Sequence, residues 1–246
     1  MITKAQVKEI HALATAKGRT ELHAFLAEGD KLVREWLHSD AKIQYVVALE
    51  SWLDGNERLT ALHPEAKVIA VSEADLARVS SVQSPNAALV VPRIPPPPQS
   101  LPTREWCIAL DTIQDPGNLG AIIRIADWFG IRHVVCSPGC ADYYNPKVVG
   151  AAMGGHLRVQ LHVASLPLFL GSCDMPVLAA TLGGKPVATV HKPAAAALVI
   201  GNESKGISPE VLKFTTQQVM IPRRGGAESL NAAVSAGILV AMLLPD

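Results

Sequence analysis

Hydrophobic and polar positions along the first 91 residues alternate between a helical and a strand-like period. Residues 2–16 carry apolar side chains at Val7, Ile10, Leu13 and Ala14, a spacing that predicts a helix. Short apolar runs predict strands at residues 22–27, 43–47, 68–71 and 87–91. Further helices are expected from residues 28–30, near residues 48–53 and from Ser72. This order of elements predicts a small α/β sandwich.

The pattern sharpens from Trp106 onward, where near-continuous apolar runs alternate with helical segments. The predicted strands are residues 106–110, 131–136, 159–163, 177–181, 197–200 and 218–221. The predicted helices are residues 118–129 and 146–153, two short ones from Ser165 and from Ser208, and a last one up to Leu244. Strands that are apolar on both faces predict a mostly parallel sheet covered by helices on both sides.

A proline-rich stretch separates these two patterns. Residues 91–102 contain six prolines, which fix φ and lack the backbone donor, so an extended, semi-rigid spacer is expected. We therefore predict an N-terminal domain at residues 1–91, a linker at residues 92–104 and a second domain at residues 105–246.

Composition narrows the function classes. The 246 residues carry 22 Lys+Arg and 22 Asp+Glu, so the net charge does not indicate binding to nucleic acid or to a membrane surface. The four cysteines show neither a disulfide framework nor a zinc spacing, so no metal is expected. The N-terminus is polar where a signal peptide needs an apolar stretch, and the apolar run at residues 230–244 is too short to span a bilayer. A cytoplasmic protein with no membrane contact is predicted.

Three polar, glycine-containing segments follow predicted strands, at residues 111–120, 201–206 and 221–231. Open parallel sheets bind ligands beyond the carboxyl ends of their strands, so these segments predict a site. The glycine patterns of dinucleotide-binding proteins, P-loop nucleotidases and serine hydrolases are absent from the sequence.

The three segments, in this order, resemble the three motifs of the SpoU/TrmH family of RNA ribose 2′-O-methyltransferases, in the SPOUT superfamily. Asp115-Pro-x-Asn-Leu-Gly-x-Ile-Ile-Arg124 resembles motif 1, Ile200-Gly-Asn-Glu203 motif 2, and residues 221–231 motif 3. Residues 1–91 resemble, more loosely, the L30e-like RNA-binding domain that often precedes the catalytic domain, and residues 17–33 carry that likeness.

The resemblance implies an α/β domain with a C-terminal trefoil knot, bound S-adenosylmethionine, and a homodimer whose active site uses both subunits. The implied catalytic residues are Asn118, Arg124, Glu203, Ser229 and Asn231. The implied cofactor-binding residues are Thr181, Leu182, Gly183, Ile200, Gly201, Asn202, Ile221, Pro222, Ser229 and Leu230. The implied RNA-binding residues are Lys17, Arg19, Arg124, Lys147, Lys205, Arg223 and Arg224.

Several roles stay open at this point. Arg124 acts either as the base or as a group that orients the phosphate and lowers the pKa of the hydroxyl, because a guanidinium is hard to deprotonate. Asn118 is expected to cap its helix while its amide faces the site, and Ser229 is a candidate cap of the last helix. Glu203 either orients Arg124 or anchors its loop.

The sequence thus predicts an S-adenosylmethionine-dependent enzyme that methylates a ribose 2′-hydroxyl in structured RNA. Ribosomal RNA is the expected substrate, because an appended L30e-like domain is more typical of ribosomal RNA enzymes than of compact transfer RNA enzymes. The alternatives are a transfer RNA methyltransferase and a non-catalytic RNA-binding or ribosome-assembly protein of the same fold. Neutral charge predicts weak non-specific RNA affinity.

Overall fold

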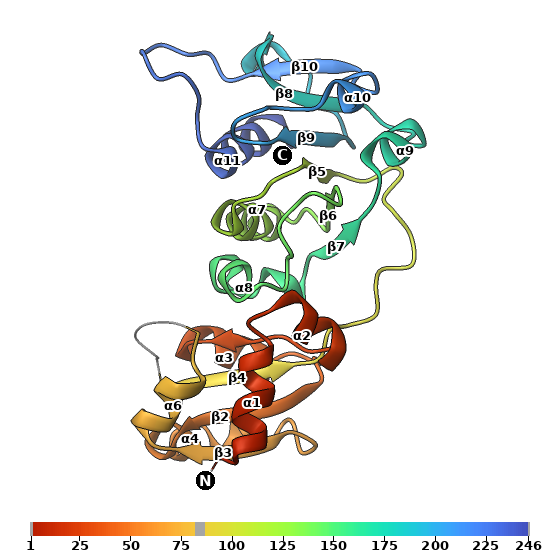
Figure 1. The fold of residues 1–246 in the computed structure, drawn as a ribbon. Helices are drawn as coiled ribbons and strands as arrows, with labels where there is room; N and C mark the ends of the chain where they lie inside the picture. Colours follow the sequence, from red (N-terminus) through yellow and green to blue (C-terminus); the bar gives the residue numbers. More distant parts are fainter. Residues whose placement is uncertain (1, 82–86, 246) are drawn as a thin grey trace. The chain divides into compact units, whose positions relative to one another are not determined.

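A computed structural model describes residues 2–81 and 87–245, and it divides into two compact units. The first unit comprises Met1–Pro96 and Tyr144–Leu157, and the second comprises Pro97–Tyr143 and Arg158–Asp246 (Figure 1). The unit boundary at Pro96 falls inside the proline-rich stretch. Residues 144–157, which the sequence pattern groups with the second domain, pack with the first unit because Val149 is buried in its core.

The first unit is a mixed four-stranded sheet with helices against it. The strand order is β1-β4-β2-β3, in which β4 runs antiparallel to its neighbours β1 and β2, and β3 runs parallel to β2. The strands are β1 (Ala27–Glu28), β2 (Ile43–Leu49), β3 (Lys67–Val71) and β4 (Ala88–Pro92). The helices are α1 (Lys4–Ala12), α2 (Ala16–Leu22), α3 (Asp30–Leu37), α4 (Glu50–Asp54), α5 (Glu57–Thr60), α6 (Glu73–Val79) and α8 (Pro146–Ala152), with a 3-10 turn η1 (Gly155–Leu157).

Both faces of this sheet are covered by apolar side chains. One cluster contains residues of α3 and α4 with Val46 and Val90, and the other contains residues of α1 and α6 with Val47 and Leu89. Successive strand residues therefore point to opposite cores, as the pleat requires. The expected sandwich of helices around a sheet is the observed architecture.

The second unit is built on a six-stranded sheet in which every pairing is parallel. The strand order is β10-β8-β9-β5-β6-β7. The strands are β5 (Cys107–Asp111), β6 (His133–Cys136), β7 (Gln160–Val163), β8 (Val177–Pro186), β9 (Ala197–Gly201) and β10 (Gln217–Met220). The helices are α7 (Pro116–Trp128), α9 (Leu166–Gly171), α10 (Pro209–Leu212) and α11 (Ala232–Leu243), with a 3-10 turn η2 (Val187–Thr189). The prediction of a mostly parallel α/β sheet is confirmed.

Helices α7 and α11 pack against each other at one side of this sheet. Gly237 makes the approach close, since a Cβ at that position would lie 3.4 Å from Cδ1 of Ile125. In the described part of the chain no helix is both long and apolar enough to cross a membrane.

Some elements differ from the sequence pattern. The strand expected at residues 22–27 is only two residues long, because α2 extends to Leu22 and His23 ends it in the left-handed conformation. The short helix α5 has too few residues for a period to be visible. Strand β8 extends past residue 181 to Pro186, because it pairs with β10 there.

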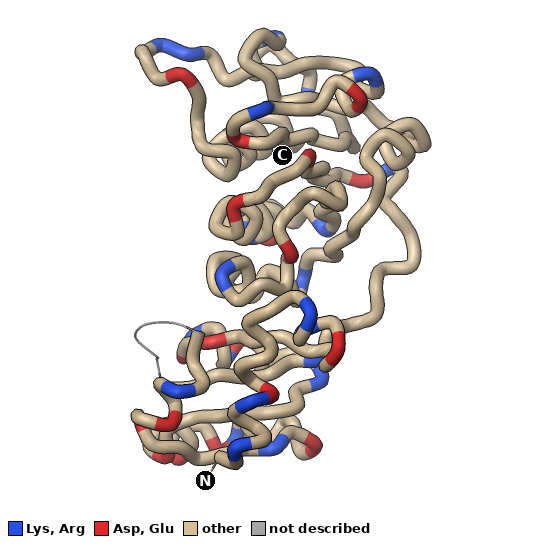
Figure 2. The backbone as a smooth tube through the Cα atoms, viewed as in Figure 1, with Lys and Arg blue, Asp and Glu red and all other residues tan. Residues whose placement is uncertain are grey.

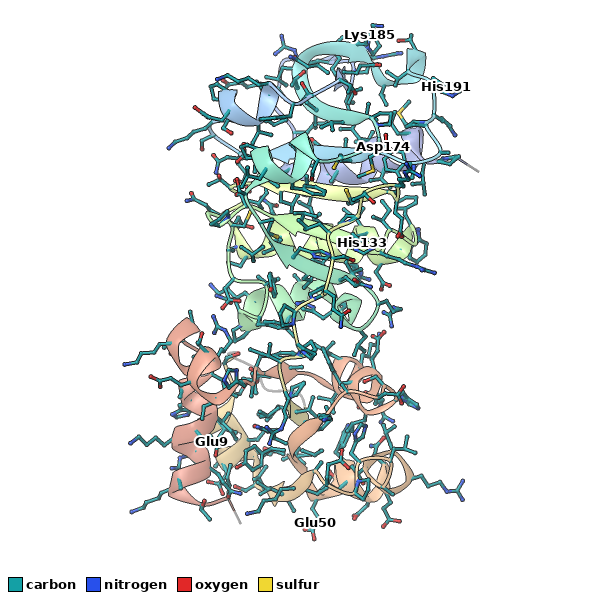
Figure 3. The ribbon with its side chains drawn as sticks, turned by 90° about the vertical axis from the view of Figure 1, so that its right-hand side faces the viewer. Glu9, Glu50, His133, Asp174, Lys185 and His191 are labelled. Carbon is teal, nitrogen blue, oxygen red and sulfur yellow. The ribbon has the colours of Figure 1, made fainter. Side chains whose placement is uncertain are left out.

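Two buried histidines face each other on neighbouring strands. His133 on β6, labelled in Figure 3, shares a 3.0 Å hydrogen bond between its Nδ1 and Nε2 of His162 on β7. Burial lowers the pKa of both imidazoles, and the Glu105 carboxylate, 3.6 Å from Nε2 of His133, opposes that shift at His133. The pair therefore favours neutral rings in the folded protein.

Candidate active site

The three polar segments meet at one edge of the six-stranded sheet. Strands β10, β8, β9 and β5 are consecutive neighbours and all parallel, so their carboxyl ends lie at the same edge. In the ladder Asp111 at the end of β5 is opposite Gly201 at the end of β9. Strand β5 is followed along the chain by its neighbour β6, and its neighbour on the other side is β9. The strand order changes direction at β5, and open α/β sheets bind ligands at such a position.

Asp111 and Thr112 join the loops at this edge. The buried Asp111 carboxylate accepts from the Ser208 backbone N–H at 2.7 Å and from the Thr112 hydroxyl at 3.1 Å. Thr112 has a φ of 61°, uncommon for a residue with a side chain, and its carbonyl accepts from Asn202 Nδ2 at 2.8 Å. Asp111 and Thr112 belong to the predicted segment 111–120 but are not among the predicted site residues, although a carboxylate at the end of a buried strand is a signal for such a position.

One chain of side-chain hydrogen bonds connects the three motif segments. Asn231 Nδ2 donates to Asn118 Oδ1 at 2.7 Å, and Asn118 Nδ2 donates to Glu203 Oε1 at 2.7 Å. These residues lie just before α11, in the first turn of α7 and in the loop after β9. The structure therefore brings together three of the five predicted catalytic residues.

The start of α11 fixes the direction of this chain. Asn231 Oδ1 accepts from the backbone N–H groups of Ala233 and Val234, so its Nδ2 must be the donor toward Asn118. Asn118 then uses Oδ1 as the acceptor and presents Nδ2 to Glu203. An amide donor at 2.7 Å requires an acceptor, which the Oε1 atom of Glu203 supplies. The backbone N–H groups at the start of α11 thus fix Asn231, which orients Asn118, which in turn holds the Glu203 carboxylate.

Two expected helix caps are corrected by this geometry. Asp115, and not Asn118, caps α7, because its Oδ1 accepts from the Asn118 backbone N–H at 2.7 Å. Asn231, and not Ser229, caps α11. Both helices begin at a side chain that accepts backbone donors, and in each case the neighbouring motif residue is left for other contacts.

Arg124 projects from the exposed side of α7. Across the described ranges no hydrogen bond or ion pair joins it to Glu203, whose Oε1 accepts from Asn118 instead. The hydrogen bond from Asn118 ties the loop that carries Glu203 to the first turn of α7. Ser229 is exposed in the segment before α11.

The predicted cofactor residues lie in three adjacent strands or just after them, and in the segment before α11. The ladder moves from Ala179 opposite Gln218 to Lys185 opposite Val219, so residues 180–184 bulge outward from β8. Gly184 approaches β10 so closely that a Cβ would lie 2.5 Å from the Gln218 carbonyl carbon. The positions are Thr181, Leu182 and Gly183 in the bulge, Ile200 and Gly201 at the end of β9 with Asn202 next, Ile221 and Pro222 after β10, and Ser229 and Leu230 before α11.

The side chains and backbone at these strand ends fit an adenosine-containing cofactor. Leu182 and Leu230 are exposed at 76% and 48%, and they offer apolar contact to a flat ring. Main-chain groups at the ends of β8, β9 and β10 can read the polar edge of such a ring. Gly201 has no room for a side chain, since a Cβ would lie 2.3 Å from the Gly206 carbonyl carbon. Among the described residues no group of three or more metal-ligating side chains is present.

The predicted RNA-binding cations differ in exposure. Lys17 is exposed and lies 3.7 Å from Glu21, and five further cations of the prediction are exposed: Arg124, Lys147, Lys205, Arg223 and Arg224. The predicted RNA contact of Arg19 is wrong, because only 3% of this residue is exposed and its Nη1 donates to the Leu13 carbonyl at 2.7 Å. Arg19 stabilises the turn between α1 and α2 and is not available to RNA.

A half-buried thiol lies beside the same strand end. Cys140 Sγ donates to the Leu110 carbonyl at 3.2 Å. A hydrogen bond from Cys136 and others from Ser137 and the backbone lower the pKa of Cys140 to about 7, against the opposing effect of burial. Cys140 is therefore partly thiolate at neutral pH.

Comparisons with known proteins agree on one family. Residues 105–241 match the SpoU rRNA Methylase family, and residues 4–90 match the MRM3-like substrate binding domain. The chain is 31% identical to the 23S rRNA (guanosine(2553)-2′-O)-methyltransferase RlmP of Bacillus subtilis, over 96% of this chain and 94% of the relative.

Two solved structures match along the whole chain. A TrmH-family protein from Porphyromonas gingivalis has a TM-score of 0.88 at 35% identity and covers 99% of this chain and 98% of its own. An rRNA methyltransferase from Sinorhizobium meliloti with bound AdoMet has a TM-score of 0.88 at 28% identity, with coverage of 99% and 95%. With its parallel sheet and the linked motif segments, the chain belongs to the SpoU rRNA methylase family.

Proposed function

We propose that this protein transfers a methyl group from S-adenosylmethionine to a ribose 2′-hydroxyl of large-subunit ribosomal RNA. The observation that carries the proposal is the hydrogen-bonded chain from Asn231 through Asn118 to Glu203, which unites the three motif segments at the edge where the cofactor residues lie. The family membership supports the same reaction.

S-adenosylmethionine would be held by the bulge of β8, the end of β9 and the segment between β10 and α11, and it supplies an electrophilic methyl group. The chain must align the 2′-oxygen in line with that methyl group and help the hydroxyl lose its proton. The exposed Leu182 and Leu230 side chains offer apolar surface against which the cofactor can be held for this alignment.

The five catalytic candidates divide by what their groups can do. A guanidinium is a poor base, so we assign Arg124 to the phosphate and the 2′-oxygen, where its positive charge stabilises negative charge. Asn118 and Asn231 can only hold and orient. Glu203 supplies the carboxylate of this set, so we assign it to receive the proton of the 2′-hydroxyl, and the Asn118 bond keeps it in place for that role.

The substrate assignment rests on the N-terminal part. Residues 4–90 of this chain match a substrate binding domain, and the chain resembles the 23S rRNA methyltransferase of Bacillus subtilis along nearly its full length. A transfer RNA substrate is the alternative within the class. A non-catalytic RNA-binding protein is the alternative outside it, and the linked Asn118, Glu203 and Asn231 argue against that reading.

Exposed apolar side chains support a homodimer. Helix α11 is apolar around its whole circumference, yet Val234 and Met242 are 50% and 38% exposed. On the neighbouring helix α7, Trp128 is 83% exposed. A second copy of the chain would cover this face and bring a second motif set beside the first. A threaded C-terminal segment and a cytoplasmic location with the ribosomal RNA are parts of the same proposal.

Calorimetry with S-adenosylmethionine tests the cofactor assignment, and absence of binding at millimolar concentration would overturn the enzyme proposal. Mapping of 2′-O-methyl groups in ribosomal and transfer RNA, with and without the protein, then names the substrate. Arg124→Ala should reduce methyl transfer at least 100-fold and leave S-adenosylmethionine affinity within about twofold. Arg132→Ala, at an exposed arginine outside the motifs, is the matched control. Unchanged turnover in Arg124→Ala would refute the assigned role.

A further inference from the structure

A groove in the first unit carries cations that the motifs do not explain. It has a volume of about 600 Å³ and lies where β2 and β3 begin and β4 ends. It is lined by Glu9, Lys42, Ile43, Gln44, Tyr45, Glu65, Lys67 and Arg93. Figure 2 shows Lys and Arg positions of this unit interspersed with Asp and Glu positions, so a local group of three cations is not a consequence of overall charge.

Strand pairing fixes the spacing of these cations. The Arg93 backbone N–H donates to the Lys42 carbonyl at 2.8 Å, and Lys67 on β3 is opposite Tyr45 on β2. All three cations are exposed, and none forms an ion pair with another side chain of the described residues. The carboxylates of Glu9 and Glu65 also line the groove, and Glu9 accepts from Tyr45, so the three cations outnumber the carboxylates and favour a polyanion.

Two further side chains indicate what enters the groove. The Gln44 Oε1 atom is buried and has no hydrogen-bond partner within the part of the chain that the structure describes. A buried acceptor without a partner is rare, and because Gln44 lines the groove, a rotation of its side chain would present this acceptor to a donor there. Tyr45 donates to Glu9 at 2.9 Å, and burial with that bond raises the pKa of its hydroxyl, so the ring stays neutral beside the groove.

We propose that this groove binds a strand of the ribosomal RNA substrate. Lys42, Lys67 and Arg93 contact phosphates, and Gln44 Oε1 accepts from a ribose 2′-hydroxyl or a base N–H group. The inference rests on the proposed function and deepens it, because it places RNA recognition on the N-terminal unit at residues other than Lys17 and Arg19. A ribose donor also explains how a protein of zero net charge can select RNA, since 2′-hydroxyls distinguish RNA from DNA.

The test uses the full-length protein and protein-free large-subunit ribosomal RNA. The triple variant Lys42→Ala, Lys67→Ala, Arg93→Ala should bind this RNA at least tenfold more weakly. Its plot of log affinity against log salt concentration should lose a slope of about 2 to 3, since each phosphate contact contributes about 0.7 to 0.9. In methyl transfer the KM for RNA should rise with little change in kcat.

A charge-matched control separates this site from general electrostatics. The variant Lys4→Ala, Lys8→Ala, Arg58→Ala removes three exposed cations of the same unit that do not line the groove. Equal RNA affinity of the two triple variants would overturn the inference. Loss of RNA binding in the groove variant alone would support it.

Gln44→Met provides a test that does not depend on charge. Removing an acceptor that has no partner should leave the free energy of unfolding unchanged or raise it, while RNA affinity falls about three- to tenfold with the salt slope unchanged. Unchanged RNA affinity in Gln44→Met would contradict the proposed donor contact. If wild-type protein neither binds S-adenosylmethionine nor methylates ribosomal RNA, the proposed function fails. If wild type does both and the groove variants match their controls, only this inference fails.

Discussion

Replacement of Asn118 by aspartate tests the hydrogen-bonded chain at the active site. The change is nearly isosteric, but it turns the Nδ2 donor, 2.7 Å from Glu203 Oε1, into a carboxylate oxygen. Two unit charges at that separation repel by about 1.5 kcal/mol at a dielectric constant of 80 and by about 6 kcal/mol at 20. Glu203 is exposed, so the lower value is the better guide.

The lost hydrogen bond adds to that repulsion. A hydrogen bond to a charged group contributes about 1.5 kcal/mol or more, so Asn118→Asp should lower the free energy of unfolding by about 2 to 4 kcal/mol at pH 8. The new carboxyl group should have a pKa above its unfolded value of about 3.9. The folded state then binds more protons than the unfolded state, so the deficit should shrink as pH falls toward 5.

Urea unfolding at pH 8 and pH 5 measures both effects. The matched control combines Asn118→Asp with Glu203→Gln, which reverses the donor and acceptor of the bond and removes the repulsion. Stability should return in this double variant, while methyl transfer should not, because the Glu203 carboxylate to which we assign the proton is gone. Wild-type stability of Asn118→Asp at pH 8, or no recovery in the double variant, would refute the reasoning.

Three further predictions use other parts of the second unit. The pKa values of His133 and His162 are lowered in the folded protein, so the unfolded state takes up protons first as pH falls. The free energy of unfolding should therefore decrease below about pH 6.5, by up to about 1.4 kcal/mol per pH unit for each ring. His162→Gln should flatten this slope in urea titrations, and an unchanged slope would contradict the assignment. Gly184→Ala should cost about 1 to 3 kcal/mol and weaken S-adenosylmethionine binding, whereas Gly150→Ala in α8, where a Cβ meets nothing within 4 Å, should leave that binding unchanged in the same calorimetry. Iodoacetamide should alkylate Cys140 before the other cysteines with half-maximal rate near pH 7, and mass spectrometry showing another cysteine modified first would rule this out.

The local pattern of apolar and polar residues predicted much of the fold. The apolar runs that predict strands are apolar because parallel strands are buried on both faces, and the run at residues 107–111 is buried along its whole length. Capping was less certain from sequence. Asp115, Asn118, Ser229 and Asn231 all have side chains that can cap a helix, and only the backbone conformation selects Asp115 and Asn231.

Long-range partners were beyond the sequence pattern. Asn118 is 85 residues from Glu203 and 113 residues from Asn231, and strand order brings the three to one edge. The burial of Arg19 was also not visible in the sequence. The sequence predicts an RNA contact, but this arginine is buried and donates to the Leu13 carbonyl.

The sequence by itself determined the two-part organisation, the alternation of strands and helices, the three motif segments and the residue types available for chemistry. Tertiary structure decided which motif residues bond to one another, which cations face solvent, that residues 144–157 pack with the first unit, and where the groove lined by Lys42, Lys67 and Arg93 lies. Periodicity reports only whether one face of a local segment is buried. The identity of a partner depends on strand order and register, which are set by the packing of the whole chain.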